Sequence, residues 1–251
     1  MKKILVISAS SNIGSSIVGK YCKGNLVTGT YRTRNNNLDH LAHNEYVKMV
    51  HLDLNSEDSM QKLYDSIDSW DLCFFCAGNP LPVKPFFESS FEEWQESVYT
   101  NSLSQLKLLH KIISKASKDA TVVFFGSGSM NKSVENFSAY TLGKTILCKM
   151  TEMLAAENPA MKFFIFGPGW FYSKIHDLIY ENLPDNSEWK NKTADMLNRG
   201  HVNEEYEKII SKIDRLINMP VASVSGKNFC ITDNLEKINK SKDSYKFRRM
   251  T

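Results

Sequence analysis

Seven short apolar runs recur along the chain, and stretches in which apolar and polar residues mix separate them. The first run, 3–7, is rich in β-branched residues, which favour strands. We predict strands at 3–7, 26–31, 47–52, 71–76, 121–126, 162–167 and 226–231. We predict helices near 13–22, 57–68, 92–116 and 137–156, with a further helical region from about 175 to 217. This alternation is typical of a parallel sheet that helices cover on both faces.

The domain organisation is simple, because the sequence shows neither an internal repeat nor a low-complexity linker. With 251 residues, 42% of them hydrophobic, the chain is long enough to bury a full core, and we predict one α/β domain over 1–251. The asparagines at 35–37 indicate a loop after the second strand rather than a domain boundary. The basic tail at about 240–251 is expected to be a frayed, solvated terminus.

Charge and hydropathy exclude several classes of partner. No apolar run approaches the ~20 residues that cross a bilayer, and Met1-Lys-Lys leads directly into a strand. We therefore expect a soluble, cytoplasmic protein with no membrane partner. A formal net charge of +3 is too small to predict a nucleic-acid partner, which needs clustered cations.

The cysteines and histidines do not predict a metal site. Cys73 and Cys76 have the spacing of a metal or redox motif, but positions i and i+3 of a strand face opposite sides. We interpret both thiols as buried small apolar residues, as free cysteine often is. Among the histidines, His40 and His43 would share a helix face, although a solvated loop edge fits them better.

The residues after the first strand form a candidate anion site. The small-residue stretch Ser8-Ala-Ser-Ser-Asn-Ile-Gly14 follows the strand and leads into a helical pattern. Such a turn lets the pyrophosphate of a dinucleotide approach the backbone at a helix N-terminus, where free N–H groups and the macrodipole attract anions.

Tyr140 and Lys144 form a candidate acid/base pair. They lie four residues apart in a predicted helix, so they share one face. A tyrosine phenol titrates near ~10 when unperturbed, and a cation held close to it lowers that pKa. Taken alone, the pair is better explained as a half-buried tyrosine and a solvated lysine.

Together these features resemble the short-chain dehydrogenase/reductase family, and the resemblance covers nearly the whole chain. It implies a single Rossmann-type, doubly wound parallel sheet of about seven strands. The matching residues are Ala9–Gly14 for the family's glycine turn, Cys76-Ala-Gly78 for the end of its Asn-Asn-Ala-Gly strand, Asn101 for its helix asparagine, Ser127, Tyr140 and Lys144 for its serine and Tyr-x-x-x-Lys, and Pro168-Gly169 with Ser173 for the turn after its sixth strand.

Three residues depart from the family's pattern. Ser8 and Asn12 stand where the family usually has glycines, and Phe75 stands at an asparagine position. Because asparagine tolerates positive φ better than most residues, we expect Asn12 to keep the shape of the turn. Ser8 is expected to place a side chain near the pyrophosphate.

The resemblance implies a catalytic role for four residues. Tyr140 would donate a proton to the substrate oxygen, and Ser127 would hydrogen-bond that oxygen, with Ser129 as a rival for this role. Lys144 would hold the nicotinamide ribose and depress the pKa of Tyr140. Asn101 would anchor a water that links the lysine to solvent.

The resemblance also implies a cofactor site, and NADP(H) is favoured over NAD(H). No acid follows the second strand before Asp39, whereas Arg32 could grip a 2′-phosphate with two hydrogen bonds. Arg32 and Arg34 are also compatible with solvated loop cations. The expected cofactor-binding residues are Ser8, Ser10, Ser11, Asn12, Ile13, Gly14, Arg32, Arg34, Asp53, Leu54, Ala77, Gly78, Tyr140, Lys144, Pro168, Gly169 and Ser173.

The substrate walls are implied to be a loop at 79–85 and a small lobe at about 170–220. Aromatic residues and cations in the lobe would suit a sugar or a nucleotide, although solvated charges on an amphipathic helix pair explain the same composition. The C-terminal strand resembles those of family reductases in surface-polysaccharide and nucleotide-sugar pathways. The expected substrate-binding residues are Asn79, Ser129, Trp170, Phe171 and Lys174.

These residues predict an NADPH-dependent reductase of a polar keto compound. An NAD-dependent dehydrogenase or epimerase, a reductase of lipid or small apolar ketones, and a non-catalytic dinucleotide-binding regulator remain alternatives. The long helical segment at 91–116 carries apolar residues on more than one face. Because the family pairs this helix with its symmetry mate, we expect a homodimer or a homotetramer.

Overall fold

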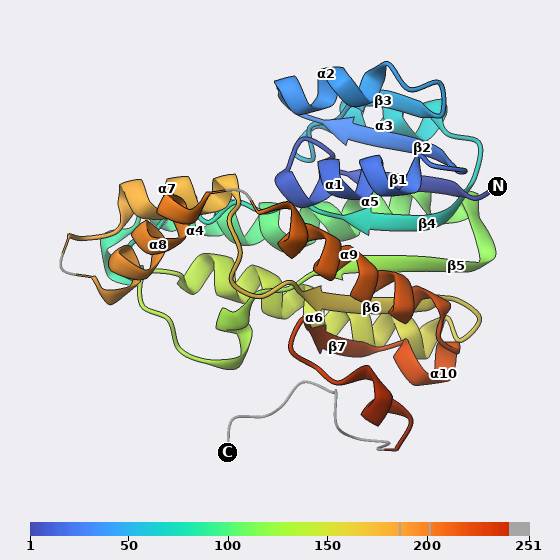
Figure 1. Cartoon of the computed structure of the whole chain (residues 1–251). Helices are drawn as coiled ribbons and strands as arrows, with labels where there is room; N and C mark the ends of the chain where they lie inside the picture. Colours follow the sequence, from blue (N-terminus) through green and yellow to red (C-terminus); the bar gives the residue numbers. More distant parts are fainter. Residues whose placement is uncertain (186, 201, 241–251) are drawn as a thin grey trace.

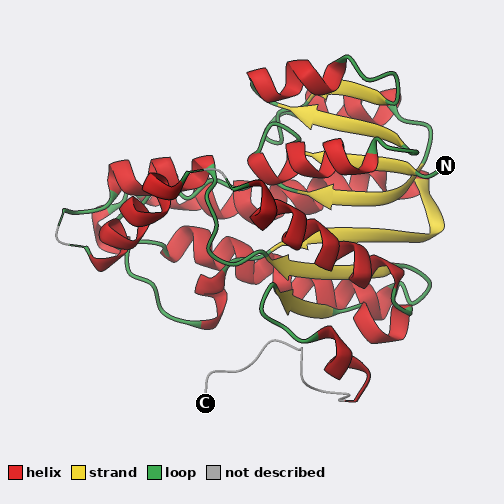
Figure 2. Cartoon of the chain, in the orientation of Figure 1, coloured by secondary structure: helices red, strands yellow, loops and turns green. Residues whose placement is uncertain are grey.

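The computed structural model describes residues 1–185, 187–200 and 202–240. Within them one seven-stranded sheet, parallel throughout, has the order β3-β2-β1-β4-β5-β6-β7 (Figures 1 and 2). The strands are β1 Lys3–Ile7, β2 Leu26–Tyr31, β3 Val47–His51, β4 Trp70–Phe75, β5 Ala116–Phe125, β6 Lys162–Gly167 and β7 Lys227–Cys230. The doubly wound parallel sheet predicted from the sequence is confirmed.

The strand order reverses beside β1, which pairs with β2 on one side and β4 on the other. In open parallel sheets the crevice beyond the carboxyl ends of the strands at such a switch point is where ligands bind. The turn after β1 and the loop after β4 therefore flank the expected site.

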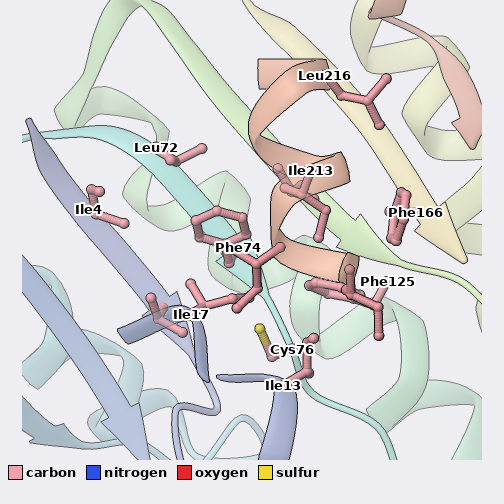
Figure 3. Close-up of a cluster of buried hydrophobic side chains, with 14 of the residues drawn as sticks. Ile4, Ile13, Ile17, Leu72, Phe74, Cys76, Phe125, Phe166, Ile213 and Leu216 are labelled. Carbon is pink, nitrogen blue, oxygen red and sulfur yellow. The ribbon is translucent and has the colours of Figure 1, made fainter. Parts of the chain in front are cut away.

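Helices cover both faces of the sheet, and side chains alternate between two buried clusters. One cluster holds side chains of α1 (Asn12–Tyr21), α2 (Asn36–Ala42) and α9 (Asn203–Asn218), and Figure 3 shows part of it. The other holds side chains of α3 (Glu57–Ser66), α5 (Ser104–Ile112) and α6 (Ser138–Glu157). Cys76 lies in the first cluster and Cys73 in the second, so the two thiols do face opposite sides of the sheet.

A lobe projects beyond the carboxyl ends of the strands, at the left of Figure 1. It contains α7 (Lys174–Asn182) and α8 (Glu188–Arg199), which pack on each other, while α4 (Phe91–Val98) packs on α6. The shorter elements are α10 (Val221–Val224), a π-helical turn at Tyr99–Leu103, and 3₁₀ turns at Phe86–Glu88, Ile113–Lys115, Gly128–Asn131 and Leu235–Lys240. No helix of the described residues is both long and apolar enough to span a membrane.

The loop predicted at 35–37 is wrong, because α2 begins there. The Asn35 side chain accepts a hydrogen bond from the Leu38 N–H and so caps the helix, a position that asparagine favours. The Leu38 side chain is buried in the first cluster. His40 lies in this helix, so the loop edge expected for it is also wrong, whereas His43 is an exposed residue in the turn that follows the helix.

Several boundaries also differ from the prediction. The helix predicted at 92–116 is interrupted by the π-helical turn, and β5 begins at Ala116 rather than at 121. In the helical region predicted at 175–217, the described residues form the three helices α7, α8 and α9. The basic tail lies outside the described residues from residue 241 onward.

Candidate active site

The turn after β1 has one strained residue, and it is not the one that the sequence indicated. Ser8 has φ of 65°, in the left-handed region that glycine adopts without penalty. Asn12, for which we expected such a backbone, is instead the first residue of α1. Its side-chain oxygen accepts a hydrogen bond from the Lys174 N–H at 3.0 Å, so it ties the turn to the start of α7.

The same turn brings the start of α1 close to the backbone of Ser8. Ser11 caps the helix, because its hydroxyl accepts a hydrogen bond from the Gly14 N–H at 3.1 Å. A Cβ atom on Gly14 would lie 2.4 Å from the Ser8 carbonyl oxygen. Only glycine therefore fits at this position without a shift of the turn.

Two cavities open along the carboxyl ends of the strands. The smaller one, of about 340 Å³, lies beside Arg32 and Asp53. The larger one, of about 770 Å³, lies beside Tyr140 and the lobe. Ala77, Gly78 and Lys174 line both cavities, so the two are adjacent.

Most of the expected cofactor-binding residues line one of these cavities. The smaller cavity is lined by Ser8, Ser10, Arg32, Arg34, Asp53, Leu54, Ala77 and Gly78. The larger cavity is lined by Ser11, Asn12, Ile13, Ala77, Gly78, Tyr140, Lys144, Pro168, Gly169 and Ser173. Gly14 lines neither, because it packs beneath the turn.

Arg32 and Arg34 differ in their surroundings. Arg32 is exposed and has no hydrogen bond or ion pair to any residue that the structure describes. The Arg34 guanidinium lies 5.4 Å from the centre of the Tyr31 ring and 3.8 Å from the Asp39 carboxylate. Of the two arginines in the smaller cavity, Arg32 therefore has the guanidinium that is more available to bind an anion.

Tyr140, Lys144 and Ser127 converge on one wall of the larger cavity. The Lys144 ammonium lies 5.7 Å from the centre of the Tyr140 ring and donates a hydrogen bond to the Ala77 carbonyl at 3.0 Å. The Ser127 hydroxyl is 3.0 Å from that of Ser129, which lines the same cavity. The fold thus brings the three side chains together at one cavity.

The pKa of Tyr140 differs in direction from the prediction. Burial raises it to about 12, and a hydrogen bond with the Ser127 side chain acts against that rise. Burial also lowers the pKa of Lys144 to about 8. The depression of the Tyr140 pKa that the sequence predicted is therefore absent, because desolvation of the phenol outweighs its neighbours.

Asn101 is fully buried and lines neither cavity. It lies in the π-helical turn, and such turns are frequent at functional sites. Its side chain accepts a hydrogen bond from the Asn79 N–H at 2.9 Å and donates to the Asn79 and Ser97 carbonyls. A Cβ atom on Gly143 would lie 2.7 Å from the Asn101 Cβ, so the close approach of α6 depends on this glycine.

The expected substrate-binding residues separate into two groups. Ser129, Trp170 and Lys174 line the larger cavity with at least partly exposed side chains. Phe171 also lines it, but its side chain is buried, and its ring packs against that of Tyr206 with centroids 5.3 Å apart. Asn79 lines only the smaller cavity.

Several residues that line the larger cavity were not among the expected site residues, and His176 and Lys132 are two of them. His176 is buried, and its Nδ1 is 3.0 Å from the Ser173 hydroxyl, while burial lowers its pKa to about 4. Lys132 follows the turn that begins after Ser127. Its position after a strand predicts no more than a solvated loop cation, so the sequence held no signal for it.

Comparisons with known proteins agree with this architecture. A family model described as short chain dehydrogenase matches residues 2–182. No curated protein matches the chain at a significant level.

Solved structures resemble the fold at low sequence identity. A short-chain dehydrogenase/reductase from Saccharomyces cerevisiae is 21% identical, with a TM-score of 0.81 over 93% of this chain and 97% of that one. An aldohexose dehydrogenase from Thermoplasma acidophilum is 16% identical, with a TM-score of 0.75 over 91% of each chain. A short-chain dehydrogenase/reductase from Burkholderia multivorans with bound NADP is 19% identical, with a TM-score of 0.72 over 93% of this chain and 97% of that one. Because the family model matches most of its length, the chain belongs to the short-chain dehydrogenase family of oxidoreductases.

Proposed function

We propose that this protein is an NADPH-dependent reductase that converts a keto group into a secondary alcohol. The observation that carries the proposal is the convergence of Tyr140, Lys144 and Ser127 on the cavity that adjoins the Arg32 cavity. Neither the acid/base pair nor the dinucleotide turn would by itself indicate a reaction site. Their adjacency supports one reaction site for a cofactor and a substrate.

The residues present fit a dinucleotide. The turn after β1 brings backbone N–H groups at the start of α1 to an open crevice, and Gly14 permits that close approach. Ser11, Asn12 and Ile13 would hold the pyrophosphate, and Asp53 with Leu54 would contact the adenine. The bound nicotinamide supplies the hydride, while the protein supplies position and a proton.

The proton would come from Tyr140. With a pKa of about 12 the phenol is protonated at neutral pH, as a proton donor must be. Lys144, with a pKa of about 8, is mostly charged at pH 7, so its ammonium can stabilise negative charge that develops on the phenol. Ser127 would hydrogen-bond the substrate oxygen, and Asn101 would position the backbone at Asn79 and anchor a water.

NADPH is proposed in preference to NADH because of Arg32. Its guanidinium is exposed in the smaller cavity, where a 2′-phosphate would lie, and it has no competing acidic partner among the described residues. Asp39, the first acid after β2, lies 3.8 Å from Arg34, which partly neutralises it. The structure from Burkholderia multivorans, which shares the fold, contains bound NADP.

For the substrate we propose a polar keto compound, such as a sugar, a polyol or a nucleotide-linked sugar in polysaccharide synthesis. The support is the wall formed by Trp170 and the cations of the lobe. The aldohexose dehydrogenase among the structural relatives shares the fold with this chain. Reduction of an apolar ketone, NAD-dependent oxidation and a purely regulatory role are the competing proposals.

We also propose a single domain that is cytoplasmic and assembles as a homodimer or tetramer. The exposed apolar side chains Phe91, Leu103, Leu142 and Met153 on α4, the π-helical turn and α6 support an interface there. Light scattering at micromolar concentration should give at least a dimer mass, and a monomer would refute the assembly.

The test of the function is Tyr140→Phe, which removes only the hydroxyl. With NADPH and a panel of sugar, nucleotide and apolar ketones, the wild type should oxidise NADPH and the variant should lose nearly all turnover. NADPH binding, measured by its fluorescence, should be almost unchanged, because the hydroxyl acts on the substrate. Activity above a few per cent in the variant would contradict the assignment, and binding without turnover by the wild type would favour a regulator.

A further inference from the structure

The rim of the larger cavity carries two lysines on one tryptophan. Lys132 Nζ and Lys192 Nζ lie 4.6 Å and 4.9 Å from the centre of the Trp189 ring. The Trp170 ring lies 5.6 Å from that of Trp189, and all four side chains line the cavity. We call these four residues the lysine–tryptophan rim. An ammonium over a ring is held in place by the ring quadrupole, while its N–H donors remain able to bind an anion.

The charge of the cavity lining is strongly unbalanced. Among the described lining residues there are five cations, Lys132, Lys144, Lys174, Lys192 and Arg199, and one acid, Asp195. Lys144 belongs to the proposed proton site, and Lys174 lines both cavities, so both can serve the cofactor side. Three cations remain on the side of the lobe.

The nearby acids neutralise these three cations only in part. Lys192 pairs with Glu188 at 2.5 Å, and Arg199 lies 3.9 Å from Glu205. Lys132 forms no ion pair with any residue that the structure describes, although its charge helps to lower the pKa of Glu188. The rim therefore presents the Lys132 ammonium, which has no ion-pair partner among the described residues, and the Lys192 ammonium, which is paired with Glu188.

The cavity that holds the rim and the catalytic side chains also has an apolar wall. Val134, Phe137, Ile175 and Ile179 line the cavity, and Trp189 packs against the buried cluster that contains Phe137 and Ile179. These side chains offer no partners for the hydroxyls of a neutral polyol, and burying a hydroxyl without a partner is unfavourable. An apolar segment of substrate would fit this wall.

We propose that the substrate carries an anionic group, a carboxylate or a phosphate, joined to its keto group by an apolar segment. The anion would bind Lys132 and Lys192 on Trp189, and the segment would pack on the apolar wall. This inference rests on the proposed reductase function, and within the polar keto compounds proposed above it favours an anionic one over a neutral sugar or polyol. The reaction is the same one: a hydride passes from NADPH to the carbonyl carbon, and the Tyr140 proton passes to the oxygen.

The first test compares keto acids with their uncharged esters. The probes are 4-oxopentanoate, 6-oxoheptanoate, 8-oxononanoate and the methyl ester of each, with NADPH as reductant. For the best length, kcat/KM of the acid should exceed that of its ester by about tenfold, as one charge-assisted contact implies. Raising the ionic strength to about 0.5 M should reduce that advantage, because salt screens exposed charges.

The second test removes one charge of the rim at a time. Lys132→Met and Lys192→Met should raise KM for the best acid by at least about fivefold more than KM for its ester, with kcat for the acid little changed. Lys118→Met is the matched control, since this exposed lysine lies near the amino end of β5, away from the cavity, and its loss changes the net charge equally. The control should behave as the wild type.

The outcomes separate this inference from the function on which it rests. Esters reduced as well as their acids, or rim variants that affect both alike, would overturn the anion site and leave the reductase intact. If neither acid nor ester is turned over, tryptophan fluorescence with NADP⁺ present measures binding of 6-oxoheptanoate directly. Binding that Lys132→Met weakens would support the site without the reaction, and no binding of any acid would overturn it.

Discussion

Ser8 offers a direct test of how the dinucleotide turn is built, because its backbone has the left-handed φ of 65°. That region is unfavourable by about 1–2 kcal/mol for a residue with a Cβ atom. Replacing Ser8 by glycine removes this strain, but the greater freedom of glycine in the unfolded chain offsets about 0.5–1 kcal/mol of the gain. No described residue hydrogen-bonds the Ser8 hydroxyl, so nothing else is lost. The net expectation is a stabilisation of about 0.5–1 kcal/mol.

The assay is thermal unfolding of the protein without cofactor. For a chain of this size 1 kcal/mol corresponds to about 2–4 °C, so Ser8→Gly should raise Tm by about 1–4 °C. Ser8→Ala is the control, because it keeps the Cβ atom and the strain and should leave Tm nearly unchanged. A Tm for Ser8→Gly at or below that of Ser8→Ala would refute the reasoning.

Asn12→Gly should destabilise the protein, in contrast to Ser8→Gly, although both substitutions bring the sequence nearer to the family's glycine turn. Asn12 has a helical backbone, and its side chain accepts the hydrogen bond from the Lys174 N–H. Loss of the Asn12 side chain should destabilise the protein by about 1–3 kcal/mol, because the Lys174 N–H loses its acceptor and glycine weakens the helix. If both glycine variants were stabilised, the assignment of strain to Ser8 alone would be wrong.

Three further predictions concern the cofactor, the packing of α6 and the pH profile. Arg32→Ala should weaken NADPH binding by about ten- to a hundredfold and NADH binding far less, and equal losses in fluorescence titrations would show that Arg32 does not contact the 2′-phosphate. Gly143→Ala should lower both Tm and kcat, because the new Cβ would lie 2.7 Å from that of Asn101. Gly19→Ala is the control: its new Cβ would have its nearest neighbour at 3.8 Å, so it should raise Tm, because alanine favours helices more than glycine does. For the reduction, kcat/KM should fall as the pH rises above about 8, where Lys144 loses its proton in the folded protein; a profile flat from pH 7 to about 10 would argue against a charged Lys144 in the reaction.

The pairing of Tyr140 with Lys144 was predictable, since four residues of helix place two side chains on one face in any setting. The carboxyl end of β5 was predictable from its apolar run, and so was the place of Ser127 beyond it. The start of α2 was missed because a run of asparagines suits a turn and a helix cap equally well. The left-handed residue was misplaced because φ in the turn depends on how the turn packs against β2, where the Ser8 N–H donates to the Thr30 hydroxyl and the Ala9 N–H donates to the Thr30 carbonyl.

The expected site residues came largely from the resemblance to a known family, whereas the sequence by itself determined the alternation of strands and helices that gives the parallel sheet. Local periodicity and turn chemistry carry that information, because a strand or an amphipathic helix is defined by neighbours a few positions away. Only the tertiary structure decided the direction of the Tyr140 pKa, since desolvation depends on every atom packed around the phenol. It also decided that Lys132 and Lys192 both lie over the Trp189 ring, because Lys132 and Trp189 are more than fifty positions apart and only the packing of the lobe beside the loop after β5 brings them together.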